Sequence, residues 1–303
     1  MNDYTKNPQE GNPPLPKRHV LGRPSVYRIG TWGIGYLPTW FSYWCVRRIA
    51  EASYLFGSTA RKNVKDNLRR VFPNIAEKTV SKLALNTFRN YSEYLVDYGR
   101  FKTLGKERLF EVLTCDGMEH IHAALARGNG VIVLTIHMGN WELGGMSAGK
   151  QGIKTNVVTA HEGMLEIDAI KERYRKRHNV NTLIIGDSPF STIELLAALR
   201  RNEMIAMLVD RSGASGKGGN ITVGFFNRPF PFPKGPLILS RMTGAAIIPS
   251  FVVKEKGAYR SINTPALFAA SEEEFTDCAR RIMLVFEDAI RRYPDQWYNF
   301  VKV

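Results

Sequence analysis

Residues Gly130 to Gly145 read GVIVLTIHMGNWELGG, and this stretch predicts the element around which the rest of the chain is arranged. Every residue from Val131 to Ile136 is β-branched except one leucine, which is typical of a strand buried within a sheet. The apolar run stops at His137, and glycine and asparagine, which favour turns and helix caps, follow directly. The pattern therefore predicts a buried strand, a turn and then a helix.

His137 and Glu142 are the candidate catalytic pair in this stretch. On one continuous helix, residues five positions apart would point about 140° apart, because each residue turns by about 100°. With His137 in the turn and Glu142 in the first helical turn, the two side chains can meet. A histidine held by a carboxylate is a general base that works near neutral pH. The alternative is a histidine with a purely structural role, which is the commoner case for a single histidine at a strand end.

The composition points to an anionic partner. The 303 residues are enough to bury a substantial core, and one large domain is the default expectation. The 42 lysines and arginines outnumber the 28 aspartates and glutamates, which gives a net charge of +14. Such an excess suits nucleic acid, an anionic membrane or an acidic protein, but no nucleic-acid-binding motif is present. The three scattered cysteines favour a reducing compartment and argue against a zinc site.

Helical and strand patterns alternate from about Gly117 onward. This alternation predicts an α/β fold with a largely parallel central sheet flanked by helices. The predicted strands are Gly130–Ile136, Lys154–Ala160, Asn181–Gly186, Met204–Asp210, Ile221–Phe226, Ala245–Val253 and Arg260–Asn263. The predicted helices are Met118–Arg127, Trp141–Gln151, Leu165–His178, Phe190–Asn202, Pro236–Thr243 and Glu273–Arg292.

The N-terminal part differs from this core. Residues 1–24 are polar and proline-rich and predict a disordered tail, followed by a single domain over 25–303. Within that domain we expect a membrane-interacting segment at 25–46, a helical region at 47–115 and an α/β catalytic core at 116–303. Residues 29–46 are uncharged and aromatic but are interrupted by glycines and a proline, which suits a membrane interface better than a spanning helix. The alternative is a buried N-terminal core helix. Two helices are predicted in the helical region, Arg47–Arg70 and Glu77–Tyr98.

The string His-Met-Gly-Asn-Trp-Glu at 137–142 resembles the signature of the lysophospholipid and glycerolipid acyltransferase superfamily, in particular its lipid A late acyltransferase branch of lauroyl and myristoyl transferases. The segments at 63–73, 223–236, 243–249 and 293–300 resemble the same branch. The resemblance implies a membrane-associated enzyme that moves a fatty acyl chain from acyl carrier protein to a lipid hydroxyl. It also implies the cytoplasmic face of a bacterial inner membrane, with a peripheral or single N-terminal anchor. No metal or cofactor is expected beyond acyl carrier protein or coenzyme A as the carrier of the acyl group.

The resemblance and the residue pattern together give roles to several residues. His137 is expected to deprotonate the acceptor, Glu142 to orient His137, and the helix start at Asn140 to offer N–H groups to the oxyanion. The resemblance implies an active-site arginine after the second core strand, for which Arg173 and Arg175 are the candidates. Further substrate-binding candidates are Asp210, at the carboxyl end of a strand, and Arg228 and Lys234, which suit a phosphate, while nearby phenylalanines suit an acyl chain. The alternatives are an ion pair or turn cap for Asp210 and core packing for the phenylalanines and the residues around them.

Two rival functions stay open at this level. The acceptor is either lipid A or another lipid or glycolipid, such as a lysophospholipid or aminolipid, and Arg211 stands where the family commonly has glutamine. Alternatively, the chain is a non-catalytic lipid-binding membrane protein, although such a module has no use for a base with an orienting acid. A serine hydrolase is not supported, because the chain has no Gly-x-Ser-x-Gly motif.

Overall fold

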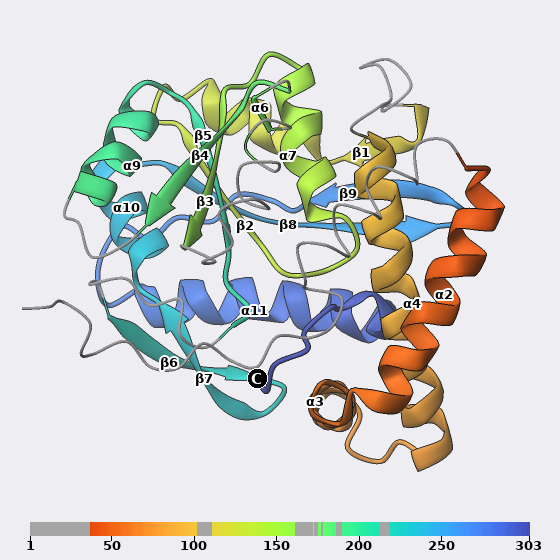
Figure 1. Cartoon of the computed structure of the whole chain (residues 1–303). Coiled ribbons are helices and arrows are strands. Elements are labelled where there is room, and N and C mark those ends of the chain that lie inside the picture. Colours follow the sequence, from red (N-terminus) through yellow and green to blue (C-terminus); the bar gives the residue numbers. More distant parts are fainter. Residues whose placement is uncertain are drawn as a thin grey trace, which may run out of the picture.

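The computed structural model describes residues 37–101, 111–160, 172, 175–176, 178–185, 190–211 and 219–303. The predicted tail at 1–24 and most of the predicted membrane-interacting segment at 25–46 lie outside these residues. Within them, the predicted α/β class is confirmed, with helices on both faces of a central sheet (Figure 1).

In the described part of the chain, the central sheet has seven strands and is parallel except for one pair. Its order is β1-β9-β8-β2-β5-β3-β4, and only β8 and β9 pair in antiparallel fashion. The strand β2, which is the predicted buried strand, lies between β8 and β5, and its residues Val131 to Leu134 are buried. The strands are β1 (Leu113–Asp116), β2 (Val131–Thr135), β3 (Thr155–Ala160), β4 (Val180–Ile185), β5 (Met204–Leu208), β8 (Ala246–Glu255) and β9 (Ala258–Asn263).

Two sets of helices cover the two faces of this sheet. Ile132 and Leu134 of β2 belong to a core cluster that includes residues of α9, α10 and α11. Val131 and Val133 face the other way and cluster with residues of α6 and α7. Because side chains alternate along a strand, His137 is expected to emerge on the face that α7 covers. The helices are α6 (Met118–Leu125), α7 (Trp141–Lys150), α9 (Phe190–Arg200), α10 (Gly235–Thr243) and α11 (Phe275–Arg292).

The N-terminal region is helical, as predicted, and its helices α2 and α4 lie side by side at one end of the sheet (Figure 1). The single helix expected over Arg47–Arg70 is wrong, because Gly57 leaves the helical conformation and divides that range between α2 and α3. No helix within the described ranges is both long and apolar enough to cross a membrane. The three helices are α2 (Thr39–Phe56), α3 (Ser58–Val71) and α4 (Glu77–Phe101).

A separate antiparallel hairpin is formed by β6 (Asn220–Phe225) and β7 (Arg228–Pro233). The sequence does not predict β7, because proline occupies every second position of this strand. Within sheets, proline is confined mainly to strands with one unpaired edge. Among the described strands, the only partner of β7 is β6, so its prolines need no ladder hydrogen bond on the other side. Of the two roles open to the phenylalanines here, an acyl-chain groove and core packing, the structure shows packing: Phe225, Phe230 and Phe232 lie in the core cluster that includes α11 residues.

The C-terminal tail returns across the molecule after the short 3-10 helix η2 (Pro294–Gln296). Asn67 of α3 donates from Nδ2 to the carbonyl oxygens of Asn299, at 3.0 Å, and Val301, at 2.8 Å. Asn63 donates in the same way to Phe300 at 3.0 Å. The helical region therefore fixes the path of the tail, which runs directly past His137.

Candidate active site

His137 and Asp210 are brought together by the register of two parallel strands. Thr135 of β2 is paired with Leu208 of β5, so the residues two positions further on, His137 and Asp210, stand at equal distances beyond the paired ends. Equivalent residues on neighbouring parallel strands point to the same face and lie within contact distance. The His137 Nδ1 atom is accordingly 2.7 Å from Asp210 Oδ1.

Asp210 is completely buried and accepts several hydrogen bonds. The backbone N–H of His137 donates to Oδ2 at 3.1 Å, and the indole N–H of Trp297 donates to the same oxygen at 2.9 Å. Burial alone would raise the pKa of Asp210, but His137, Arg211 and the hydrogen bond from Trp297 lower it to about 2. Its charge therefore stabilises the fold above about pH 4, and this stabilisation is lost as the pH falls towards 2.

The ionised Asp210 determines which tautomer His137 adopts. A carboxylate only accepts hydrogen bonds, so the Nδ1 atom of a neutral His137 must carry the proton. The lone pair is then on Nε2, the nitrogen that a general base uses. Asp210 was a candidate for substrate binding, with a structural role as the alternative; in the structure it has no exposed surface, and its Oδ1 lies 2.7 Å from Nδ1 of His137.

Glu142 has a different principal partner from the one expected. Its two oxygens accept from Arg175 in a fork geometry, with Nε to Oε2 at 3.0 Å and Nη2 to Oε1 at 2.6 Å. Arg175 also donates from Nη1 to Thr182 Oγ1 at 3.1 Å, and both members of the pair are buried. Burial opposes the charge on Arg175, yet Glu142 raises the pKa of the guanidinium above its ordinary value. Arg175 was expected to bind a phosphate through its guanidinium group. In the structure, that group donates its paired hydrogen bonds to the carboxylate of Glu142.

Asn140 caps α7. It is fully buried, and its side-chain oxygen accepts from the backbone N–H of Leu143 at 3.3 Å. Gly139 before it adopts φ of +53°, and a Cβ atom there would lie 2.0 Å from the carbonyl oxygen of Val252. The Gly-Asn pair therefore makes the sharp turn that starts a helix immediately after His137.

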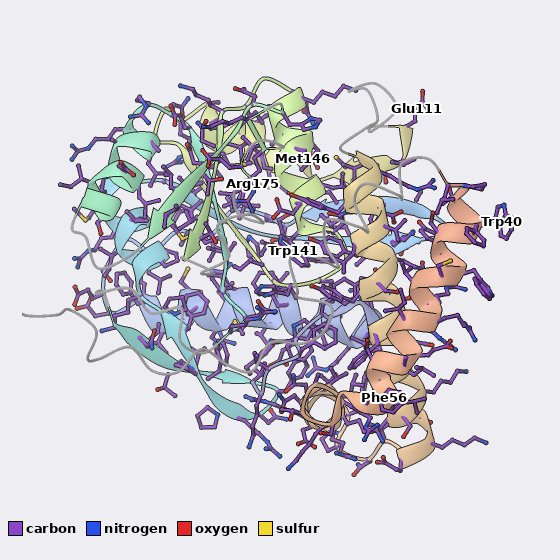
Figure 2. All side chains as sticks on the ribbon, in the orientation of Figure 1. Trp40, Phe56, Glu111, Trp141, Met146 and Arg175 are labelled. Atoms are coloured by element: carbon purple, nitrogen blue, oxygen red, sulfur yellow. The ribbon has the colours of Figure 1, made fainter. Side chains whose placement is uncertain are left out.

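A cavity of about 70 Å³ opens beside this turn. His137, Glu142 and Arg175 all line it, although Asp210 and Asn140 do not. Trp141 forms one wall, with its ring 5.2 Å from that of His137, and Figure 2 shows Trp141 and Arg175 in the same central region under α7. A second cavity of about 30 Å³ adjoins the first and is mainly apolar. The two share four lining residues, Thr135, Trp141, Gly145 and Ala206.

The other predicted site residues that the structure describes, Arg228 and Lys234, do not line these cavities. Arg173 lies outside the described residues. Arg228 is exposed at the start of β7, and Lys234 precedes α10, so both belong to the hairpin region. Among the residues the structure describes, no cluster of three or more histidines, cysteines, aspartates or glutamates could hold a metal ion.

The fold and the site together define a class of protein. A histidine held by a buried carboxylate at the carboxyl ends of parallel strands, facing a partly apolar cavity, is an arrangement typical of enzymes that activate a hydroxyl or amine. Residues 16–302 match the family described as bacterial lipid A biosynthesis acyltransferase, and the chain belongs to this family of acyltransferases.

Curated relatives from two kinds of bacteria are similar to the chain. The lipid A biosynthesis lauroyltransferase of Escherichia coli (strain K12) is 26% identical over 281 residues, covering 91% of this chain and 84% of that protein. The palmitoleoyltransferase of the same strain is 24% identical over 276 residues, covering 88% of each. A phosphatidylinositol mannoside acyltransferase of Mycobacterium tuberculosis (strain ATCC 25618 / H37Rv) is 25% identical over 253 residues, covering 82% and 78%.

Replacement of Asp210 by asparagine should separate orientation of His137 from folding. Asp210→Asn removes the charge that fixes the Nδ1–H tautomer, and we expect kcat for acyl transfer to fall by on the order of 10²–10⁴. Steady-state kinetics measure the fall, with circular dichroism to check the fold. Asp277→Asn, at an exposed position of α11, is the control and should keep the wild-type rate. A wild-type kcat in Asp210→Asn would contradict the orienting role.

Removal of Arg175 should destabilise the protein strongly. Arg175→Met leaves the Glu142 carboxylate buried without its fork, and breaking a buried pair in this way lowers the free energy of unfolding by about 3–5 kcal/mol. Urea denaturation measures the change, with Arg200→Met on the exposed side of α9 as control. The double variant Arg175→Met/Glu142→Leu should recover part of the loss. An unchanged stability in Arg175→Met would show that the pair is not a structural ion pair.

Proposed function

We propose that this enzyme transfers a fatty acyl chain from an acyl thioester to a hydroxyl group of a lipid, with His137 as the general base. The observation that carries the proposal is the contact between His137 Nδ1 and Asp210, which leaves Nε2 as the basic nitrogen of a residue that lines the cavity. Membership of the acyltransferase family supports the reaction class.

The proposed reaction needs no nucleophile from the protein. Nε2 of His137 takes the proton of the acceptor hydroxyl as its oxygen attacks the carbonyl carbon of the thioester. The tetrahedral intermediate collapses with cleavage of the carbon–sulfur bond, and the imidazolium returns the proton to the departing thiolate. Asp210 stabilises the imidazolium meanwhile through its buried negative charge. The helix α7 begins at Trp141 next to His137, so its first N–H groups are the candidates for holding the oxyanion.

The adjoining cavities support an acyl substrate. The smaller cavity extends from the larger one beneath α7 and is lined by Gly144, Gly145 and Ala148, whose lack of bulk leaves room next to the sheet. We propose that the reacting carbonyl lies beside His137 and that the first carbons of the chain follow the apolar path under α7. Met118 and Ile121 of α6 then stand at the far end of this path.

The outer face of α2 supports association with a membrane surface. Trp40, Trp44 and Leu55 share one helical face with Arg48, and all four are exposed. Trp40 lies at the outer edge of the molecule in Figure 2. Large aromatic side chains combined with arginine favour the interface of an anionic membrane. We propose that α2 rests on the cytoplasmic face of the bacterial inner membrane, as a peripheral contact.

The acceptor is proposed to be a lipid that carries a sugar. Relatives of near-equal similarity are named for lipid A and for phosphatidylinositol mannoside, and both names denote glycolipids. Lipid A biosynthesis is therefore the proposed context, with another glycolipid as the alternative. The proposed donor is acyl carrier protein, an acidic partner to which the net charge of +14 is complementary.

Direct incubation tests this function. The purified chain is mixed with acyl carrier protein thioesters, or with acyl-coenzyme A, and a bacterial glycolipid extract that includes under-acylated lipid A. Mass spectrometry should find a product heavier by one acyl group, and His137→Ala should lose most of the activity while keeping its fold. Exposed His122→Ala is the matched control. No transfer from any donor would favour a lipid-binding role instead.

A change in the shared wall of the two cavities should alter the acyl preference. A Cβ atom on Gly145 would meet only ordinary contacts, at 3.8 Å from Val157 and 3.9 Å from Thr155, so a larger side chain can be introduced. Gly145→Val should narrow the path under α7 and lower kcat/KM for long acyl donors more than for short ones, by about 10-fold or more. Lys150→Val, at the exposed end of the same helix, is the control for the effect of placing a β-branched residue in α7. An equal loss for all chain lengths would contradict the proposed path.

A further inference from the structure

Trp297 is a buried tryptophan whose polar atom is directed at the carboxylate of Asp210. Its side chain is only 3% exposed, and its indole N–H donates to Asp210 Oδ2 at 2.9 Å. The other carboxylate oxygen is the one that accepts from His137 Nδ1. Trp297 does not line either cavity beside His137, so it acts on the site from behind Asp210.

The backbone around Trp297 is joined to the turn that carries His137. The N–H of Tyr298 donates to the carbonyl oxygen of His137 at 2.7 Å, and the N–H of Gly139 donates to that of Gln296 at 3.0 Å. Met138 and Trp297 form an isolated antiparallel bridge between these two bonds. The tail therefore pairs with the His137 turn as a short strand would, and this pairing fixes the place of the indole.

The same tail segment is attached to two other strands. Asn299 donates from Nδ2 to the backbone carbonyl of Asp210 at 3.0 Å. Both polar atoms of the Gln296 side-chain amide bind the backbone of Lys254 in β8: Oε1 accepts from its N–H at 2.8 Å, and Nε2 donates to its carbonyl oxygen at 2.9 Å. Gln296 to Asn299 thus bridge the ends of β2, β5 and β8.

We propose that Trp297 is a positioning residue, which fixes the Asp210 carboxylate through its indole N–H and thereby sets the orientation and basicity of His137. A carboxylate on a flexible χ2 torsion can rotate, and the indole donor on Oδ2 opposes that rotation while Oδ1 faces Nδ1. The indole also neutralises part of the carboxylate charge. Without the indole N–H, Asp210 would favour the imidazolium form of His137 more strongly.

The test replaces the donor and keeps an apolar ring. Trp297→Phe should lower kcat about 10- to 100-fold with little change in KM, because Trp297 lies outside the cavity. The pKa of His137 should rise by roughly 0.5 unit, since the carboxylate loses a donor. Both the acidic limb of the pH–rate profile and an NMR titration of labelled histidine measure this shift.

An isosteric replacement guards against a variant that does not fold. β-(3-Benzothienyl)alanine at position 297 keeps the bicyclic ring but has sulfur in place of N–H. It should reproduce the changes in kcat and in the pKa of His137 without loss of thermal stability. Phe225→Leu is the packing control, because the Phe225 ring packs edge-on against Trp297 with 5.9 Å between the ring centroids. This variant should lower Tm and leave the pKa of His137 unchanged.

The kinetic part of this inference rests on the proposed function, whereas the titration does not. If the wild type transfers no acyl group, the proposed function fails, and the pKa of His137 in the two variants still decides the role of Trp297. A wild-type pKa of His137 in both the phenylalanine and the benzothienyl variants would overturn the proposal and leave Trp297 as a packing residue.

Discussion

The hydrogen bond between His137 Nδ1 and Asp210 Oδ1, at 2.7 Å, is the interaction that the site depends on. Three parts of the molecule converge on it. The register of β2 and β5 brings the two residues to the same level, the Asn140 cap starts α7 directly behind the turn, and the C-terminal tail supplies the indole of Trp297. Asp210 is fully buried and its pKa is lowered to about 2, so in the proposed mechanism its negative charge orients and stabilises the imidazole of His137.

Much of the fold could be predicted from the sequence, because buried parallel strands read as continuous apolar runs. The strand before His137 and the helix after it were placed to within one residue. The proline-containing β7 and the short β1 were missed, since an edge strand with alternating prolines resembles a loop and four residues carry little periodicity. The break at Gly57 was missed because a glycine is tolerated inside a helical pattern unless the tertiary packing bends the chain there.

The sequence identifies most of the residues at the site, but it does not show which of them pair with one another. Sequence spacing favoured Glu142 as the partner of His137, because only five positions separate them, whereas Asp210 is distant along the chain. The equal offsets of His137 and Asp210 from their strands were a usable signal, but they become meaningful only once β2 and β5 are known to be neighbours. The fork between Arg175 and Glu142 and the contribution of Trp297 depend on tertiary contacts that no local pattern contains. In the structure, Glu142 lines the cavity as part of an ion pair.

The imidazole Nδ1 proton of His137 offers the most direct test of this arrangement. In histidine-labelled protein, NMR should show a downfield Nδ1–H resonance, assigned by its loss in His137→Ala, that persists in Glu142→Gln and disappears in Asp210→Asn. This result would establish Asp210 as the group that holds the tautomer. A resonance that survives in Asp210→Asn and disappears in Glu142→Gln would contradict the account and assign the orienting role to Glu142.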